Sequence, residues 1–323
     1  MNRTMNRTMW VAIVLGIPAV GMSLGIPEPA GAQPRVVSTT TIIGDWTAQI
    51  GGDLVASAFE HQTILQPGVD PHIYEPVPAD SIAIEQADLI LFNGYELEPE
   101  LIRIIRSTGS NARQVPLAEG LQPLALAGGL ESDPHLWGDV QLGMEMVETL
   151  IEELQQLLPE EQEVIATQGQ QYLAQLRSLH EWVGEQIATI PPDQRRLVTT
   201  HDAFQYYAQA YGLEVVGSLI GLSTEEQPSA QTVARLVQDV QQANVPAIFA
   251  ETTINPALIQ TVAEEAGVEL AEQELFSDSL GSLGEEGDTY VGMIVSNTCT
   301  IAIALGGSCA PFEPESRSEV TPE

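Results

Sequence analysis

A long stripe of apolar residues at helical spacing, in the middle of the chain, constrains the fold most. Between residues 160 and 190 these residues recur at intervals of 7, 4, 3, 4, 4 and 3 positions: Ile165, Tyr172, Leu176, Leu179, Val183, Ile187 and Ile190. Such spacing predicts one amphipathic helix, and Pro191 and Pro192 end it because proline cannot continue a helix. At the usual helical rise this segment is about 46 Å long, too long for one small domain. We therefore expect it to join two domains.

On both sides of this helix, short β-rich runs alternate with helical segments. The expected strands are residues 36–40, 88–92, 196–201, 246–252 and 274–278. The expected helices are residues 139–158, 203–211, 231–243, 256–266 and 290–305. Strands that alternate with helices indicate parallel sheets and the α/β class. A chain of 323 residues is long enough for two such domains.

The N-terminus has the pattern of an export signal. Arg3 and Arg7 precede an apolar stretch at residues 10–24, and Ala30-Gly31-Ala32 is a small-residue cleavage motif. The stretch is broken and shorter than the roughly 20 residues of a membrane span, so cleavage near Ala32 and no stable membrane insertion are expected. Because no cysteine lies near this motif, we do not expect a lipid anchor of the bacterial lipoprotein kind.

The predicted organisation has five parts. They are a signal peptide (1–32), an N-terminal α/β lobe (33–159), a linking helix (160–190), a C-terminal α/β lobe (191–308) and an acidic tail (309–323). The only cysteines, Cys299 and Cys309, lie at the last boundary. In an oxidising compartment they could pair and staple the last helix to the tail. A metal role is the alternative, but no further ligands lie nearby.

The charge of the chain excludes one class of partner. Eleven basic residues, all arginines, stand against 45 acidic ones, and the formal net charge is −34. Nucleic acid is therefore not an expected partner, since its binding requires a basic surface. Scattered carboxylates attract cations but select no particular metal.

Two of the five histidines share a local setting. His72 and His135 each follow Asp-Pro, in residues 70–72 and 133–135. Proline fixes the backbone directly before each ring, and a rigid loop suits a metal ligand because little mobility is lost on binding. Two loop histidines that only cap turns are the alternative explanation.

Two further donors end predicted strands. His201 closes the run at 196–201 and Asp278 closes the run at 274–278. Ligands of open α/β sheets bind outside the carboxyl ends of strands. Singly, His201 could pack against the sheet and Asp278 could cap a helix. Together with His72 and His135 they form a candidate set of three imidazoles and one carboxylate, which suits one divalent transition metal, zinc or manganese.

The remaining candidates have weaker settings. His61 is a possible peripheral ligand, His180 on the long helix is expected to pack or face solvent, and Asp288 rivals Asp278. Outer roles or ordinary turn and packing roles are open for Glu75, Asp80, Trp137 and Tyr74, and the two aromatic residues are expected to shield the site from water.

Several ordered motifs carry a resemblance to a known family. They are "PGVDPHIYEP", "ADLILFNG", "DPHLW", "VTTHDAFQYYAQAYGL", "GLSTEEQPSA", "AIFAETTINP" and "FSDSLGSLGEEGDTYVGMI". Over residues 35–306 the chain resembles the metal-specific (zinc/manganese) solute-binding proteins of ABC transporters. The resemblance implies two parallel-sheet α/β lobes joined by one long rigid helix, with metal in the interlobe cleft.

The same resemblance implies ligands and partners. Its metal ligands would be His72 and His135 from the first lobe, and His201 and Asp278 from the second. The implied partners are a membrane permease and its ATPase, and the protein would act as a periplasmic monomer. Two departures leave the metal open. The chain has no His-rich loop after His72, unlike many zinc-type members, and it has His201 where manganese-type members often have glutamate.

Capture and delivery of the metal, without catalysis, is therefore the expected function. One alternative is a structural or adhesive protein whose lobes are stapled by metal. The other is a zinc-dependent hydrolase, but the chain has no H-E-x-x-H or G-x-S-x-G motif. Four protein ligands also make a closed site, whereas catalytic zinc usually keeps a position open.

Overall fold

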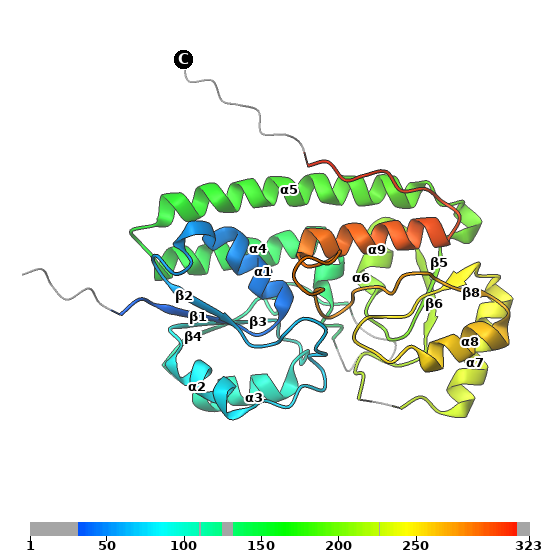
Figure 1. The fold of residues 1–323 in the computed structure, drawn as a ribbon, viewed down its shortest axis with the longest axis horizontal. Helices are drawn as coiled ribbons and strands as arrows, with labels where there is room; N and C mark the ends of the chain where they lie inside the picture. Colours follow the sequence, from blue (N-terminus) through cyan, green and yellow to red (C-terminus); the bar gives the residue numbers. More distant parts are fainter. Residues whose placement is uncertain (1–31, 110, 125–131, 226, 315–323) are drawn as a thin grey trace, which may run out of the picture. The chain divides into compact units, whose positions relative to one another are not determined.

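The computed structural model describes residues 32–109, 111–124, 132–225 and 227–314 (Figure 1). Of the predicted signal peptide only Ala32 lies within these ranges, and residues 315–323 of the predicted tail lie outside them. Gln33 onward forms one compact unit. No helix in the described ranges combines the length and the apolar character needed to cross a membrane.

The first lobe is built on a four-stranded parallel sheet. Its strands are β1 (Arg35–Ser38), β2 (Glu60–Thr63), β3 (Leu89–Phe92) and β4 (Arg113–Pro116), in the order β2-β1-β3-β4. Helix α1 (Thr41–Gly51) covers one face, and α2 (Pro78–Gln86) and α3 (Pro99–Thr108) cover the other (Figure 1). Strand β3 is buried at every position. Its apolar run is therefore explained by helices on both faces.

Alternation along β3 assigns its side chains to two cores. Leu89 and Leu91 belong to a core with α1, α4 (Val140–Leu157) and α5 (Gln162–Ala188). Ile90 and Phe92 belong to the core with α2 and α3. Successive side chains of a strand point to opposite faces, so a continuous apolar run fills both.

Helix α5 confirms the predicted long helix, two residues shorter at each end. It packs against α1 and α4 of the first lobe, and against α6 (Gln205–Tyr211) and α9 (Tyr290–Ala304) of the second. Leu176 and Leu179 are fully buried in a core that contains residues of both lobes. The long stripe therefore joins the lobes through one shared apolar interior.

The second lobe contains two short parallel strand pairs. They are β5 (Arg196–Thr199) with β6 (Glu214–Ser218), and β7 (Ala247–Ile248) with β8 (Glu269–Leu270). The Phe249 N–H donates to the Val198 carbonyl at 3.0 Å and ties the pairs together. Helices α7 (Ala230–Ala243) and α8 (Ala257–Ala266) complete this core.

The predicted strand at 274–278 is wrong. Only Leu275 pairs there, in an isolated bridge with Glu251. The residues that pair with β7 are Glu269 and Leu270, which form β8. Residues 271–274 then bulge out, and Leu275 pairs with Glu251. Residues 271–274 face only two residues of the neighbouring segment, 249 and 250, so regular pairing cannot continue.

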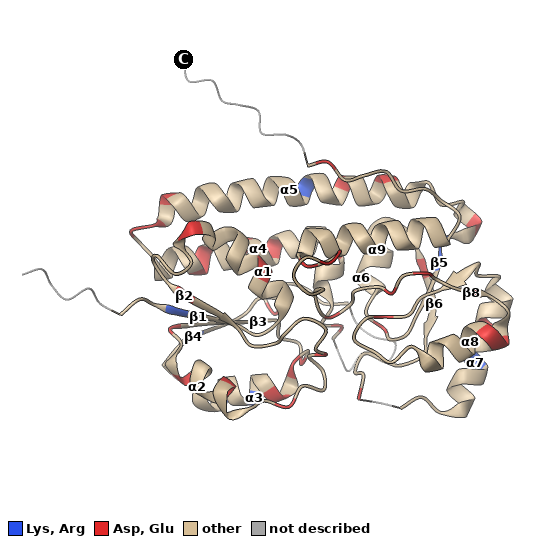
Figure 2. Cartoon of the chain, viewed as in Figure 1, with Lys and Arg blue, Asp and Glu red and all other residues tan. Residues whose placement is uncertain are grey.

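Cys299 and Cys309 form a disulfide that joins α9 to the following segment. This segment lies along α5, where the Ala310 N–H donates to Gln186 Oε1 at 2.9 Å and the Phe312 ring meets Trp182. The pairing of the cysteines, which the sequence left open, thus fixes the start of the predicted tail. Acidic residues are spread over the helices and loops of both lobes, and basic ones are few (Figure 2).

Three single 3₁₀ turns complete the described elements: η1 (Gly52–Leu54), η2 (Leu136–Gly138) and η3 (Pro192–Gln194).

Candidate metal centre

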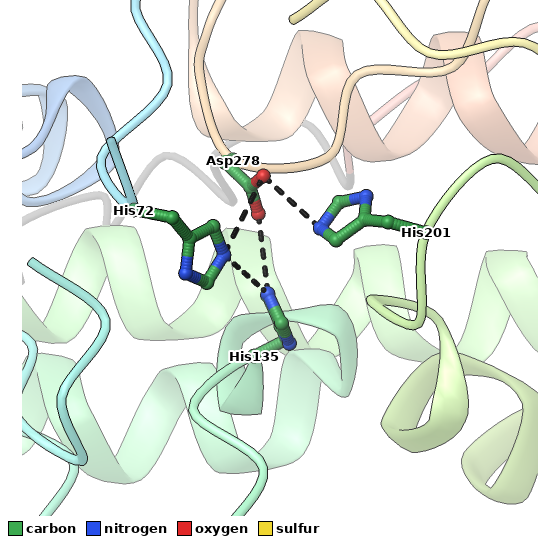
Figure 3. A group of neighbouring side chains, drawn as sticks. All are labelled: His72, His135, His201 and Asp278. Atoms are coloured by element: carbon green, nitrogen blue, oxygen red, sulfur yellow. Dashed lines mark hydrogen bonds and ion pairs between the residues drawn. The ribbon is translucent and has the colours of Figure 1, made fainter. Parts of the chain in front are cut away.

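Four loops bring His72, His135, His201 and Asp278 together (Figure 3). His72 lies between β2 and α2, and His135 directly precedes η2. His201 follows β5 by two residues, and Asp278 follows the Leu275 bridge by three. His201 and Asp278 therefore lie just beyond the carboxyl ends of paired segments, where parallel α/β sheets bind ligands.

The four donor groups have the spacing of a metal site. The Nε2 atoms of His72 and His135 are 3.3 Å apart, and His135 Nε2 is 3.3 Å from Asp278 Oδ1. His201 Nε2 and His72 Nε2 lie 3.1 and 3.9 Å from Asp278 Oδ2. A tetrahedron with donors about 2.0–2.1 Å from a central zinc has edges of about 3.3 Å. The four groups are thus arranged around a point at which one ion fits.

Burial leaves several of these donor atoms without partners. Asp278 and the two histidines His135 and His201 are at most 1% exposed, and His72 is 8% exposed. Nε2 of His201 and both carboxylate oxygens of Asp278 are buried and accept or donate no hydrogen bond within the described chain. Buried polar atoms are normally paired because leaving them unpaired is costly. A cation between them would satisfy all three atoms.

The two Asp-Pro-His motifs form the same turn. Oδ1 of Asp70 accepts the backbone N–H of His72 at 2.9 Å, and Oδ1 of Asp133 accepts that of His135 at 3.0 Å. Proline has no N–H, so the aspartate bonds the next residue along. The motif therefore holds each histidine backbone rigidly against its own loop.

Buried carboxylates orient two of the imidazole rings. His135 Nδ1 lies 2.7 Å from Asp133 Oδ1. His201 Nδ1 contacts Glu251 Oε2, and the backbone N–H of His201 donates to Glu251 Oε1 at 2.8 Å. A carboxylate that accepts from Nδ1–H directs the lone pair of Nε2 toward a metal. Both rings are thus pre-set for ligation through Nε2.

The charges of the site follow from these contacts. Burial lowers the pKa of His135, but the hydrogen bond to Asp133 and the nearby Asp278 carboxylate outweigh it and raise this pKa to about 9. Burial is likewise outweighed at His201, where Glu251 and Asp278 hold the pKa well above its usual value. Burial raises the pKa of Asp278, but the two rings overcome this effect and hold it well below its usual value. Without a metal, His135 and His201 therefore hold protons beside the ionised Asp278 carboxylate.

His72 differs from the other two histidines. Burial lowers its pKa to about 3, and the Asp278 carboxylate offsets this only in part. Its ring is therefore neutral over the physiological range and needs no deprotonation before it binds a metal.

The aromatic residues predicted near the site differ in position. The Trp137 ring lies edge-on to His135, with ring centroids 5.3 Å apart, and its Nε1–H donates to the Ser277 carbonyl at 3.0 Å. Trp137 thus covers the site as expected. Tyr74 instead donates to Asp80 Oδ2 at 2.9 Å and packs with the α2 and α3 core.

The weaker candidates lie outside the four-residue group. His61 on β2 is bonded through Nε2 to Ser38 Oγ at 3.0 Å, and His180 Nδ1 lies 3.1 Å from Tyr211 Oη. The rival carboxylate, Asp288, accepts the Gly284 N–H at 2.9 Å within its own loop. Asp80 accepts the Val77 N–H at 2.8 Å at the start of α2, and Glu75 is exposed.

Sequence reasoning did not identify the carboxylates that hold the histidines. Asp70 and Asp133 stand inside the two motifs, so their proximity was a usable signal. Glu251 is the penultimate residue of the predicted strand at 246–252, beside the predicted strand that ends at His201. Its role depends on the pairing of distant strands, which one sequence does not reveal.

Comparisons with known proteins identify the family of this chain. The model of the family described as zinc-uptake complex component A, periplasmic, matches residues 36–304. The chain is 35% identical over 302 residues to the zinc-binding protein TroA of Treponema pallidum, covering 89% of this chain and 96% of TroA. It is 30% identical over 305 residues to the manganese-binding lipoprotein MntA of Halalkalibacterium halodurans, covering 93% and 99%.

Solved structures confirm the two-lobed α/β fold. The periplasmic zinc-binding protein TroA from Treponema pallidum aligns with a TM-score of 0.80 and 34% identity, covering 84% of this chain and 99% of TroA. Fe(III)-bound YtgA from Chlamydia trachomatis aligns with a TM-score of 0.78 and 26% identity, covering 86% and 100%. The chain therefore belongs to the family of periplasmic zinc-uptake complex component A proteins.

Proposed function

We propose that this protein captures one divalent transition metal, zinc or manganese, and delivers it to the membrane permease of an ABC importer with its ATPase. The ligands are His72, His135, His201 and Asp278. One observation carries the proposal: four buried groups from two lobes converge so that one donor atom of each lies within 4.8 Å of the others, and three of their atoms have no other partner.

Zinc is the first choice of metal. Three imidazoles and one carboxylate suit zinc on ligand softness, although the same donors also bind manganese. Relatives of this chain are named zinc-binding and manganese-binding proteins in turn. A direct comparison of the two metals therefore belongs in the first experiment.

Family membership supports a proposal for the cellular setting of the chain. We infer a periplasmic location after cleavage near Ala32, and a monomer with lobes at residues 33–159 and 191–308 around the helix at 160–190. We infer no catalysis, because four ligands leave no open position for a metal-bound water. The metal-stapled structural role remains the competing function and is separated from import by the experiment below.

The test is a metal titration of the chain from Gln33 onward, stripped of metal. Zinc and manganese are titrated in competition, with stoichiometry from elemental analysis. We expect one equivalent of metal. Alanine at any ligand should weaken binding by more than the roughly 10- to 100-fold typical of an outer hydrogen-bond partner. His61→Ala and His180→Ala serve as controls and should bind as the wild type does.

Two results would contradict the proposal. Wild-type affinity in all four ligand variants would show that the site is elsewhere. Stoichiometric binding without any growth defect of a deletion strain on limiting metal would favour the structural role over import.

A further inference from the structure

His72 is held in place less directly than the other two imidazole ligands. The rings of His135 and His201 are fully buried, and each has a carboxylate at Nδ1. His72 keeps 8% exposure, and within the described residues no side chain is hydrogen-bonded to its Nδ1. The position of its ring therefore depends on the backbone that carries it, the loop 68–72.

The second lobe holds this loop at two points. Ser279 Oγ accepts the Gly68 N–H at 2.8 Å. The Thr224 hydroxyl donates to Asp70 Oδ2, while Oδ1 of the same carboxylate accepts the His72 N–H at 2.9 Å. Neither hydroxyl belongs to the four-residue ligand group. Both act on the loop that presents His72.

The bond from Ser279 to the loop 68–72 is connected to the site through the backbone, because Ser279 is the residue after Asp278. Ser279 is 1% exposed and lies 3.3 Å from Thr41 Oγ1, which also accepts the Leu280 N–H at 2.9 Å. The bond from Thr224 to Asp70 is charge-assisted and so stronger than one between neutral groups. The loop with His72 and the loop with Asp278 are therefore fastened to each other from opposite lobes.

We propose that Thr224 and Ser279 form a hydroxyl clamp that fixes the loop 68–72 against the second lobe and sets the rate at which metal leaves the site. When the clamp opens, the loop moves away with His72, the least buried ligand. His135, His201 and Asp278 then retain the ion with one ligand fewer. Thr224 and Ser279 are positioning residues, and the inference rests on the proposed function.

The first experiment needs no metal. Hydrogen exchange of the segment 66–73 is measured by mass spectrometry in the metal-free full chain. In Thr224→Val and Ser279→Ala this segment should exchange at least about tenfold faster than in the wild type, because an amide that loses its acceptor or a rigid neighbour opens more often. Thr224→Ser restores the hydroxyl and should restore protection.

Ser223→Ala is the matched control. Its hydroxyl accepts the Glu225 N–H at 3.4 Å within the same segment as Thr224, and among the described residues it makes no bond to the first lobe. Exchange in this variant should equal the wild type. Thermal unfolding shows whether each variant still folds, and Ser279→Ala keeps the test valid if Thr224→Val does not fold.

The second experiment measures zinc dissociation into an excess of chelator, together with the association rate. Loss of one partly exposed hydrogen bond should raise the dissociation rate roughly fivefold to tenfold. The association rate should stay within about twofold, since most changes in a preformed site affect dissociation. Exchange and dissociation that remain at wild-type values in Thr224→Val and Ser279→Ala would overturn the clamp.

The two proposals fail separately. A wild-type chain that takes up no metal contradicts the proposed function, whereas the exchange experiment still decides whether the clamp exists. Normal zinc binding with unchanged exchange and dissociation in the variants removes the clamp and leaves the proposed function intact.

Discussion

Replacement of Glu251 by glutamine tests how the site prepares His201 for a metal. Glu251 is fully buried, and its two oxygens accept from the backbone N–H and from Nδ1 of the same histidine. Glutamine has the same shape but only one acceptor. If its oxygen stays on the backbone N–H, its amide N–H faces Nδ1, and the ring must carry its proton on Nε2, where the metal binds. If the amide is flipped, two N–H donors face each other.

Either arrangement has a cost that can be estimated. A buried donor or acceptor left unsatisfied costs about 1–3 kcal/mol, which corresponds to roughly 5- to 150-fold in an equilibrium constant. Loss of a hydrogen-bond partner of a metal ligand typically lowers metal affinity by about 10- to 100-fold, which lies within this estimate. We expect Glu251→Gln to weaken zinc binding by about 10- to 100-fold at pH 7.

The assay is competition for zinc against a chromogenic chelator. Glu269→Gln, an exposed change on β8 with the same effect on net charge, is the control and should bind like the wild type. Urea unfolding of both variants separates a loss of affinity from a loss of fold. If Glu251→Gln bound zinc within twofold of the wild type, the carboxylate would not set the proton position of His201, and the reasoning would fail.

Three further predictions concern protons, the disulfide and the shared core. Hydrogen bonds that outweigh burial raise the pKa of His135 to about 9, so at pH 7 zinc must displace a proton. Zinc affinity should rise with pH from 6 to 9 by up to about tenfold per unit per proton, with proton release measured calorimetrically in buffers of different ionisation enthalpy. Paired serines at Cys299 and Cys309, which open a ten-residue loop, should lower the unfolding free energy by about 2–3 kcal/mol in urea without changing zinc affinity. Leu176→Ala, at a fully buried position of α5, should cost about 2–5 kcal/mol in the same assay.

The elements predicted well are those with a strong local pattern. The stripe on α5 continues over seven turns, so its helix could be placed to within two residues at each end. Strand β3 is buried on both faces, and its continuous apolar run identified it. Strands β2 and β4 were missed because each mixes exposed and half-buried polar residues, so that neither a run nor an alternation marks them.

Pairing between strands was harder to predict than the strands themselves. Residues 268–276 contain two short apolar groups, at 268–271 and 275–276, and the strand was predicted at the second group instead of the first. The two residues of β7 pair with 269 and 270, and the next pair joins Glu251 to Leu275. The bulge at 271–274 therefore depends on the segment 247–251, which is distant in sequence. Such tertiary constraints are absent from any local pattern.

At the proposed site, the sequence predicted the four candidate donor side chains and left their supports unassigned. The repeated Asp-Pro-His motif and the strand-end positions singled out four residues that the structure brings within 4.8 Å of one another. Glu251 is hydrogen-bonded to His201, 50 positions away in the chain. Thr224 is hydrogen-bonded to Asp70, 154 positions away. Nothing near them in the sequence marks these partners.

The shared core around α5 determines how the energy of metal binding is distributed. A site whose frame is already assembled loses little free energy to ordering of the chain, so the attraction between donors and ion contributes almost fully to affinity. The same rigidity acts in reverse during unloading. Under the proposed function we expect spontaneous loss of the ion to be slow, because the frame around α5 stays assembled while the loop 68–72 opens and closes.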